Sequence, residues 1–261
     1  MRQFIFNGKT EKNGSIIVSG KDYRYLMTVL RLKINDRIDV RLKNGELVLM
    51  EISSCNGKTA VLNPIPREKE ATGQGVSAFS VENQATLAQS KEIWLFQFMP
   101  KPQKMDLIIR QATECGVSII VPIVGDFSVN QDGKGRLERW DRIIKEARQQ
   151  SGSPVSTKVL EPVSVERAAD SWAAESSKEK TKAFILHEDG EQAKDLSSIL
   201  KSGETPKKIA LAVGCEGGFS QKEFEKLKQV GFLPLHFNTN VLRAETAALY
   251  GIAVLQQVLY L

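Results

Sequence analysis

The 261-residue sequence predicts an α/β protein in which a small β-barrel precedes a larger domain built on a parallel sheet. Two observations support this prediction. The first 65 residues form short apolar runs separated by Asn-Gly pairs, whereas strand and helix patterns alternate from residue 92 onward. Such alternation is typical of a parallel sheet covered by helices. We therefore expect domains at residues 1–70 and 91–261, joined by a polar linker at residues 71–90 that has no sustained periodicity.

Asn-Gly pairs mark the turns of the N-terminal domain, because both residues tolerate the positive φ that a tight hairpin requires. They occur at residues 13–14, 44–45 and 56–57. An apolar stripe formed by Tyr25, Leu26, Val29 and Leu30 predicts one helix, over residues 21–32. The strands are predicted at residues 3–6, 15–18, 37–41, 47–52 and 58–62.

Helix ends are well marked in the C-terminal domain. Gly116 and Gly231 follow two helical patterns, and Ser220 with Glu223 forms a capping box. The patterns predict helices over residues 104–115, 136–150, 221–230 and 244–260, and strands over residues 93–98, 117–124, 155–159, 183–186, 209–213 and 233–237.

Composition excludes several classes of protein. With 41% hydrophobic and 26% charged residues, the chain can bury a core, so disorder is not its main state. No apolar run reaches the roughly 18 residues that span a bilayer, and no secretory signal is visible, so we expect a cytoplasmic protein without a membrane partner. Cys55, Cys115 and Cys215 lie far apart without zinc-ligand spacing, which predicts reduced thiols and no metal.

Positive charge is concentrated in the N-terminal domain. Residues 1–70 carry 13 lysines and arginines against 8 aspartates and glutamates, whereas the rest of the chain is balanced. A basic module beside a neutral one suits a protein that holds a polyanion with the first and performs chemistry with the second. A solvated basic surface without a partner explains the charge equally well.

Two segments at predicted strand ends are candidates for chemistry. Residues 213–220 (VGCEGGFS) carry three glycines between a strand and a helix, so the backbone can approach a ligand closely; tight turn geometry alone is the alternative. The segment is neither GxGxxG nor a phosphate loop. In residues 238–249 a polar turn leads through Arg243 and Glu245 into a helix that is apolar on more than one face, which favours a dimer interface. Alternatively, Glu245 only complements the helix dipole and Arg243 is a surface cation.

Together, GCEGGFS at residues 214–220 and VLRAETA at residues 241–247 resemble the paired motifs of the RsmE family. These SPOUT-superfamily enzymes methylate uracil N3 in small-subunit (16S) ribosomal RNA. The likeness extends to VLRL at residues 29–32, KMD at 104–106, ATECGV at 112–117, RW at 139–140 and QSG at 150–152. It implies a PUA-like RNA-binding barrel and an α/β domain whose C-terminal part forms a trefoil knot, with a homodimer assembled through that knot region.

The resemblance also implies a cofactor and a set of site residues. S-adenosylmethionine would be held largely by main chain, and a catalytic pair would act on the unpaired base: Arg243 would stabilise the uracil anion, while Glu245 would position Arg243 or accept the proton. The implied cofactor-binding residues are Leu186, His187, Gly214, Glu216, Gly217, Gly218, Leu242, Arg243 and Thr246, and the implied RNA-binding residues are Arg2, Arg24 and Arg31.

The chain departs from the family pattern at several positions. Cys215 replaces a usual proline, Phe127, Ser153 and Asn240 stand where arginines are common, and Arg24 and Tyr25 replace a frequent pair of histidines. Cofactor binding through the backbone tolerates such changes, whereas arginine contacts to RNA do not. The leading hypothesis is therefore a methyltransferase acting on ribosomal RNA or the small subunit, and the alternative is a paralogue that binds RNA without catalysis.

The two histidines of the chain are further candidates. His187 is expected to line the cofactor loop through its backbone, with a role as a base as the alternative. His236 lies within an apolar strand and is expected to be a core or edge residue.

Overall fold

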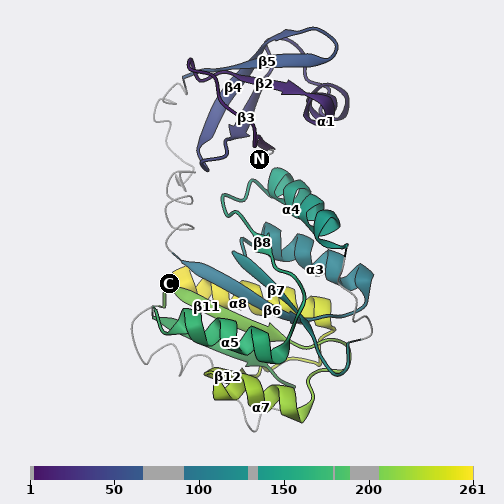
Figure 1. Cartoon of the computed structure of the whole chain (residues 1–261), viewed down its shortest axis with the longest axis vertical. Coiled ribbons are helices and arrows are strands. Elements are labelled where there is room, and N and C mark those ends of the chain that lie inside the picture. Colours follow the sequence, from purple (N-terminus) through teal and green to yellow (C-terminus); the bar gives the residue numbers. More distant parts are fainter. Residues whose placement is uncertain (1–2, 67–90, 129–134, 179, 189–205, 261) are drawn as a thin grey trace. The chain divides into compact units, whose positions relative to one another are not determined.

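The computed structural model describes residues 3–66, 91–128, 135–178, 180–188 and 206–260 (Figure 1), with the backbone alone described at residues 258–260. The chain divides into two compact units, the first containing the N-terminal sheet and the second the larger sheet. The predicted linker lies outside the described residues, so its boundaries stay a prediction. Within the described part, no helix is long and apolar enough to cross a membrane.

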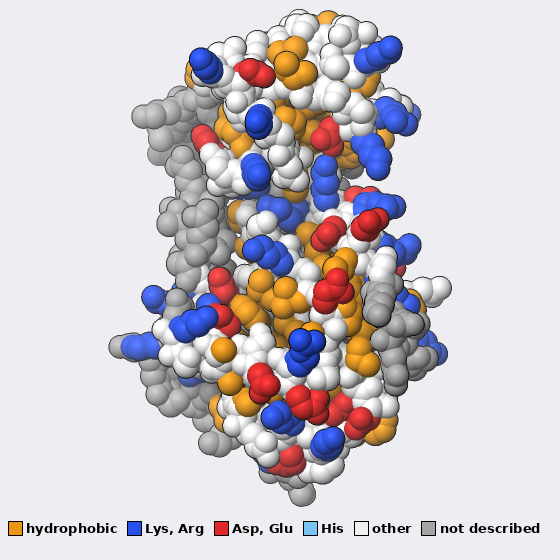
Figure 2. Space-filling view, viewed as in Figure 1, with side chains coloured by type: hydrophobic (Ala, Val, Ile, Leu, Met, Phe, Trp, Pro, Cys, Tyr) orange, Lys and Arg blue, Asp and Glu red, His pale blue; other side chains and the backbone are white. Residues whose placement is uncertain are grey.

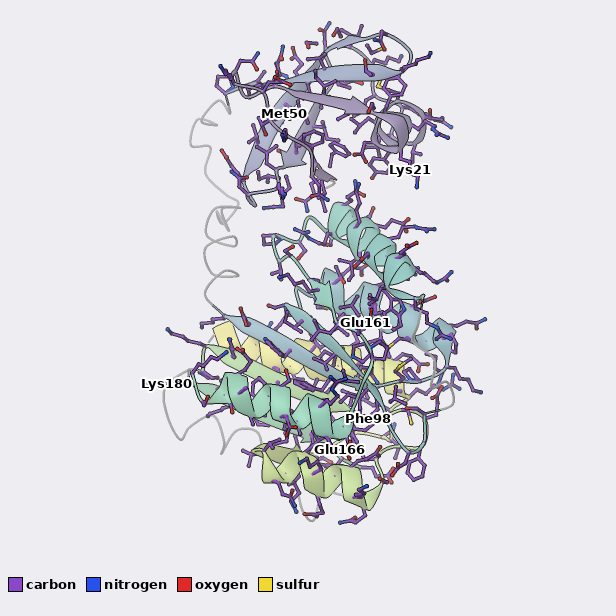
Figure 3. The ribbon with its side chains drawn as sticks, viewed as in Figure 1. Lys21, Met50, Phe98, Glu161, Glu166 and Lys180 are labelled. Atoms are coloured by element: carbon purple, nitrogen blue, oxygen red, sulfur yellow. The ribbon has the colours of Figure 1, made fainter. Side chains whose placement is uncertain are left out.

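The first unit is a five-stranded sheet around its own core. Its order is β1-β3-β4-β5-β2, antiparallel except for the parallel pair β1 and β3. Gly45 and Gly57 have φ of +87° and +85°, as the Asn-Gly hairpin prediction requires. Met50, labelled in Figure 3, is fully buried in this core. The strands are β1 (Gln3–Ile5), β2 (Ile16–Ser19), β3 (Arg37–Arg41), β4 (Leu47–Cys55) and β5 (Thr59–Pro64).

The helix predicted over residues 21–32 is shorter in the structure. Helix α1 (Gly20–Arg24) continues into one π-helical turn, η1 (Tyr25–Val29), which buries Leu26. Arg31 then takes a positive φ of 57°, a conformation that cannot continue a right-handed helix. Leu26, Tyr25 and Leu30 of the predicted stripe do pack on the core, but Val29 is 66% exposed and the left-handed residue ends the helix before Leu32.

The second unit is built on a sheet in which every pairing is parallel, as predicted. Its order is β12-β10-β11-β6-β7-β8, and β9 also pairs with β7. The strands are β6 (Glu92–Phe98), β7 (Ile119–Val124), β8 (Lys158–Val159), β9 (Val163–Ser164), β10 (Thr181–Leu186), β11 (Lys208–Val213) and β12 (Phe232–Leu235).

Helices cover both faces of this sheet (Figure 1). Successive residues of β6 point to opposite sides: Leu95 packs in a core with α3, α4 and α8, and Phe96 in a core with α5 and α7. The helices are α3 (Pro102–Glu114), α4 (Leu137–Ser151), α5 (Val165–Ser176), α7 (Gln221–Gln229) and α8 (Ala244–Tyr260).

Helix α5 and strand β9 were not predicted from the sequence. The helical signal is nevertheless present, because Val165, Ala168, Ala169 and Trp172 are buried at helical spacing and the Ser164 side chain accepts the N–H of Arg167 as an N-cap. Two short strands, β8 and β9, which each pair with β7, precede the cap and obscured the helix start.

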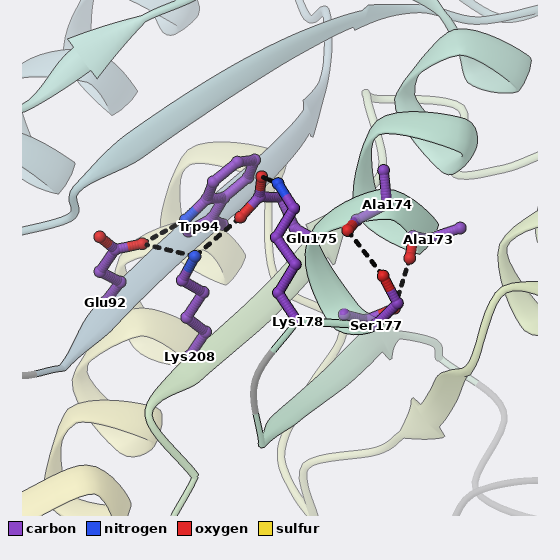
Figure 4. A network of polar contacts seen from close by, with 9 residues as sticks. Glu92, Trp94, Ala173, Ala174, Glu175, Ser177, Lys178 and Lys208 are labelled. Carbon is purple, nitrogen blue, oxygen red and sulfur yellow. Dashed lines mark hydrogen bonds and ion pairs between the residues drawn. The ribbon is translucent and has the colours of Figure 1, made fainter.

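Charged side chains form a network at the end of the second sheet where β6 and β11 begin (Figure 4). Lys208 Nζ lies 2.8 Å from Glu175 and 3.5 Å from Glu92, and the Trp94 indole donates to the same Glu92 carboxylate. Hydrogen bonds from Lys178 and Lys208 lower the pKa of Glu175 to about 2. This ion pair network ties α5 to β6 and β11.

We expect Glu175→Gln to reduce stability at neutral pH but not in acid. Because the pKa of Glu175 is depressed on folding from 4.5 to about 2, its contribution is complete above pH 4.5 and is lost as the pH falls towards 2. Thermal unfolding of both proteins between pH 7 and 2.5 should show a difference in Tm that shrinks below pH 4.5. Glu225→Gln, at an exposed pair on α7, is the control, and an equal pH response in both variants would contradict the assignment.

Candidate functional site

A cavity of about 360 Å³ opens where β10, β11 and β12 end. Parallel sheets bind ligands at this edge, since loops from neighbouring strands meet there. Three stretches of chain form the wall: the end of β10, the glycine loop after β11, and the segment that joins β12 to α8. The lining residues are 186–188, 213–219, 236, 237, 239–242, 244 and 247.

The glycine loop is folded tightly upon itself. A Cβ on Gly214 would lie 2.8 Å from the Gly218 Cα, so this approach of two main-chain segments excludes any side chain at residue 214. Gly218 has φ of +73° and donates its N–H to the Cys215 carbonyl at 3.0 Å. The loop therefore exposes main chain to the cavity at its three glycines, all of which are lining residues.

The predicted capping box of α7 is confirmed, and it also ties down a second loop. Buried Glu223 accepts the Ser220 N–H at 2.8 Å and the Asp126 N–H at 2.7 Å. The Ser220 hydroxyl in turn donates to the Asp126 carboxylate at 2.7 Å. These bonds join the turn after β7 to the end of the glycine loop, beside Phe98, which is labelled in Figure 3.

Two histidines connect the other walls of the cavity. The His187 N–H donates to the Leu235 carbonyl at 3.0 Å, which extends the pairing of β10 with β12. His236 Nδ1 lies 3.2 Å from the His187 carbonyl oxygen, and the His187 ring packs on Phe224. His236, expected to be a core or edge residue, is half-buried one residue after the end of β12 and lines the cavity.

A buried glutamine on β6 forms hydrogen bonds to the main chain at the start of the glycine loop. Gln97 is fully buried on β6, and its Nε2 donates to the carbonyls of Phe98, Val213 and Gly214 at 2.9–3.3 Å. Since Oε1 in that place would face three acceptors, these contacts determine the orientation of the amide. Sequence reasoning missed this residue, although a lone glutamine in an otherwise apolar strand was a usable signal.

Lys104 joins the glycine loop to the start of α8. Its ammonium lies 3.3 Å from Glu216 Oε1 and 3.2 Å from Glu245 Oε2. Burial alone would lower the pKa of Lys104, but hydrogen bonds to the two carboxylates outweigh it and raise this pKa. For Glu216, burial is likewise outweighed by backbone hydrogen bonds and Lys104, so its pKa is lowered. A bridging cation thus sets the spacing between two segments that are distant in sequence.

Family comparisons cover most of the chain. Residues 88–256 match the family model of the RNA methyltransferase domain, and residues 18–65 match that of the RNA methyltransferase PUA domain. Ribosomal RNA small subunit methyltransferase E of Aquifex aeolicus is 31% identical over 69% of this chain and 75% of its own length. The chain belongs to the ribosomal RNA small subunit methyltransferase E family. The RsmE resemblance, and with it an RNA methyltransferase with a PUA-like domain, is confirmed.

Other members of the family match over nearly the full length. Ribosomal RNA small subunit methyltransferase E 2 of Borreliella burgdorferi is 29% identical over 99% of this chain and 98% of its own length. The crystal structure of ribosomal RNA small subunit methyltransferase E from Neisseria gonorrhoeae bound to S-adenosyl methionine superposes with a TM-score of 0.78. It covers 99% of this chain at 22% identity, with 98% of its own chain matched, and so supports the fold.

The structure brings most of the implied cofactor residues of this family member to one cavity. Arg243 and Thr246 are exposed at the start of α8 and are not among the lining residues, and Glu245 faces Lys104. Arg243 and Glu245 form no ion pair with each other. The lining residues from the implied set are Leu186, His187, Gly214, Glu216, Gly217, Gly218 and Leu242.

The charges around the cavity are acidic. Among the described lining residues, Glu188 and Glu216 are the only carboxylates and no lysine or arginine is present. Lys104, outside the lining, neutralises part of this charge at Glu216, and the carboxylates that line the cavity do not favour a phosphate. The described residues also contain no group of three or more histidines, cysteines and acids able to hold a metal.

Of the implied RNA-binding residues, Arg24 and Arg31 are exposed on the first unit, and Arg2 lies outside the described residues.

Proposed function

We propose that the chain is an S-adenosylmethionine-dependent methyltransferase acting on uridine N3 of small-subunit ribosomal RNA. The observation that carries this proposal is the acidic cavity with main-chain walls at the ends of β10, β11 and β12. The relatives are named as methyltransferases of small-subunit ribosomal RNA, which supports the choice of this RNA as the substrate.

The cavity suits a sulfonium cofactor for two reasons. Gly214, Gly217 and Gly218 line the cavity without side chains, so an adenine or a methionine end can approach the main chain closely. Glu188 and Glu216 place negative charge beside a ligand that carries a positive one. The cofactor supplies an activated methyl group, and the protein then has to align it with the acceptor.

The acceptor nitrogen imposes two requirements on the protein. Uridine N3 carries a proton and is paired in a duplex, so the base has to be unpaired or flipped and the proton has to be removed. Arg243 is exposed at the start of α8 and stabilises the uracil anion. Glu245, on the same helical turn, accepts the proton, and its Oε2 lies 3.2 Å from the Lys104 ammonium. Lys104 is thus a positioning residue for Glu245.

Isothermal titration with S-adenosylmethionine tests this function directly. Micromolar binding supports the enzyme, whereas the non-catalytic RNA-binding alternative predicts none. Mass spectrometry of ribosomal RNA from a deletion strain, with loss of one N3-methyluridine expected, identifies the nucleotide.

Assembly and location complete the proposal. We propose a cytoplasmic homodimer formed through the knot region, supported by the outward Tyr250 ring on α8, which is 44% exposed and contacts Phe237. Sedimentation velocity tests the dimer. The trefoil knot stays a prediction, because residues 189–205, between β10 and β11, lie outside the described residues.

Basic side chains predominate on the visible face of the first unit, whereas both signs mix over the second (Figure 2). We expect replacement of Arg24 and Arg31 by alanine to weaken RNA binding and to reduce its logarithmic salt dependence by roughly 1–2, since each lost phosphate contact removes about 0.7. Filter binding across salt concentrations measures both effects.

The control removes the same charge elsewhere in the first unit, through Lys43→Ala and Lys58→Ala in the hairpin turns. S-adenosylmethionine affinity should be unchanged in both double variants. If the arginine variant keeps the wild-type salt slope, this surface does not bind RNA.

A further inference from the structure

Phe127 is a large apolar side chain left 49% exposed beside the site. It lies in the turn after β7, at the same edge of the sheet as the cavity. Single exposed aromatics are common, so exposure alone indicates nothing. Phe127 differs from such residues in two ways. Several hydrogen bonds hold the turn that carries it, and its side chain lies against Gly217.

Hydrogen bonds within the turn, and others from Glu223 and Cys215, hold the segment that carries Phe127 in place. The Ser128 N–H donates to the Gly125 carbonyl at 3.1 Å, and the Gly125 N–H donates to the Ser128 hydroxyl at 3.0 Å. Asp126 is held by Glu223, and the Cys215 thiol donates to the Phe127 carbonyl at 3.4 Å. The ring is therefore presented from a preorganised backbone, which lowers the entropy lost on binding.

The ring also lies directly against the wall of the cavity. A Cβ added to Gly217 would be 2.9 Å from the Phe127 Cβ and 3.2 Å from its Cγ, and Gly217 itself lines the cavity. Phe127 is not a lining residue, so a ligand inside the cavity leaves the ring uncovered.

We propose that Phe127 is a stacking platform for a base of the unpaired RNA strand at the mouth of the cofactor cavity. This inference rests on the proposed function. A base removed from a duplex loses its stacking partners, and an aromatic ring replaces them while leaving the hydrogen-bonding edge of the base accessible. The role is substrate binding, separate from the groups assigned to proton transfer.

Three variants separate stacking from mere packing on the glycine loop. Phe127→Leu keeps an apolar cover over Gly217 without a π-face, Phe127→Ala removes both, and Phe127→Trp keeps both. Stacking predicts roughly 5- to 150-fold weaker RNA binding for Leu and Ala, the range that corresponds to about 1–3 kcal/mol per stacked base, with near wild-type binding for Trp. Single-turnover methylation at saturating RNA should change little, so the effect belongs in the RNA affinity.

The measurements are RNA binding with a small-subunit RNA, titration of S-adenosylmethionine, and photocrosslinking of 5-bromouridine-substituted RNA with peptide mapping to Phe127. Leu160→Ala, at a described residue of the second unit that is apolar, exposed and outside the cavity lining, is the control. Wild-type RNA affinity in Phe127→Leu, or a loss in Phe127→Trp equal to that in Phe127→Ala, overturns the inference. The inference is also overturned if the variants lose the dimer but keep the wild-type RNA affinity. Phe127 would then be a contact between two copies of the chain. If the wild-type protein neither binds S-adenosylmethionine nor methylates RNA, the proposed function itself is wrong, and the role of Phe127 is overturned together with it.

Discussion

Gly218→Val is expected to abolish detectable binding of S-adenosylmethionine while leaving a folded protein. Gly218 lines the cavity, and a Cβ placed there would meet no protein atom within 4 Å, so a branched side chain would extend into free space beside the ligand. Its φ of +73° is also a conformation that L-residues adopt at a cost of roughly 1–2 kcal/mol. Isothermal titration measures the loss, and circular dichroism with thermal unfolding checks the fold.

Gly231→Val is a closely matched control. Gly231 has φ of +92°, equally open surroundings, and a place after α7 that does not line the cavity. Both variants should therefore lose similar stability, but only Gly218→Val should lose the cofactor. Equal cofactor affinity in the two variants would remove the glycine loop from the binding site.

Glu245→Gln is expected to slow single-turnover methyl transfer by roughly 10²–10⁴-fold, the usual contribution of a positioned acid or base. The glutamine keeps the size of the side chain but cannot accept the N3 proton, and it weakens the hold of Lys104. Arg243→Lys should also be harmful, because lysine retains the charge without the planar fork. Rapid-quench assays with saturating cofactor measure both rates.

The alternative assigns Glu245 only a role at the positive end of the α8 dipole. That role predicts a loss of about 0.3–1 kcal/mol in stability with methyl transfer intact. Glu166→Gln, at a first-turn acid of α5, is the matched control because it changes the dipole term without approaching the cavity. If Glu245→Gln behaves like Glu166→Gln, and Arg243→Lys keeps the wild-type rate, the pair has no catalytic role.

Local patterns were sufficient for most of the secondary structure. The capping box of Ser220 and Glu223 and the glycine that follows α7 lie within a few residues of the elements that they end, so their effect is visible in the sequence. Arg31 shows the limit of such patterns, because its left-handed backbone ends a helix whose apolar stripe continues. Helix α5 was missed although its spacing was adequate, since short strands precede it directly.

The site was only partly predictable. Main-chain walls follow from glycines and strand ends, which the sequence displays, and the implied cofactor residues other than Arg243 and Thr246 line one cavity with Gly214. Lys104 was noted only as part of the KMD motif and Gln97 not at all, because their roles depend on partners more than 100 residues away.

By itself, the sequence determined the alternation of strands and helices, the glycine loop, and a pair of motifs specific enough to indicate the family. Each of these depends on interactions between near neighbours or on residue type alone. Only the tertiary structure decided that Glu245 faces Lys104 rather than Arg243, and that Phe127 rests on Gly217. The physical reason is that the parallel sheet brings the ends of β6, β7 and β11 to one edge, so that charges and rings from distant segments meet there.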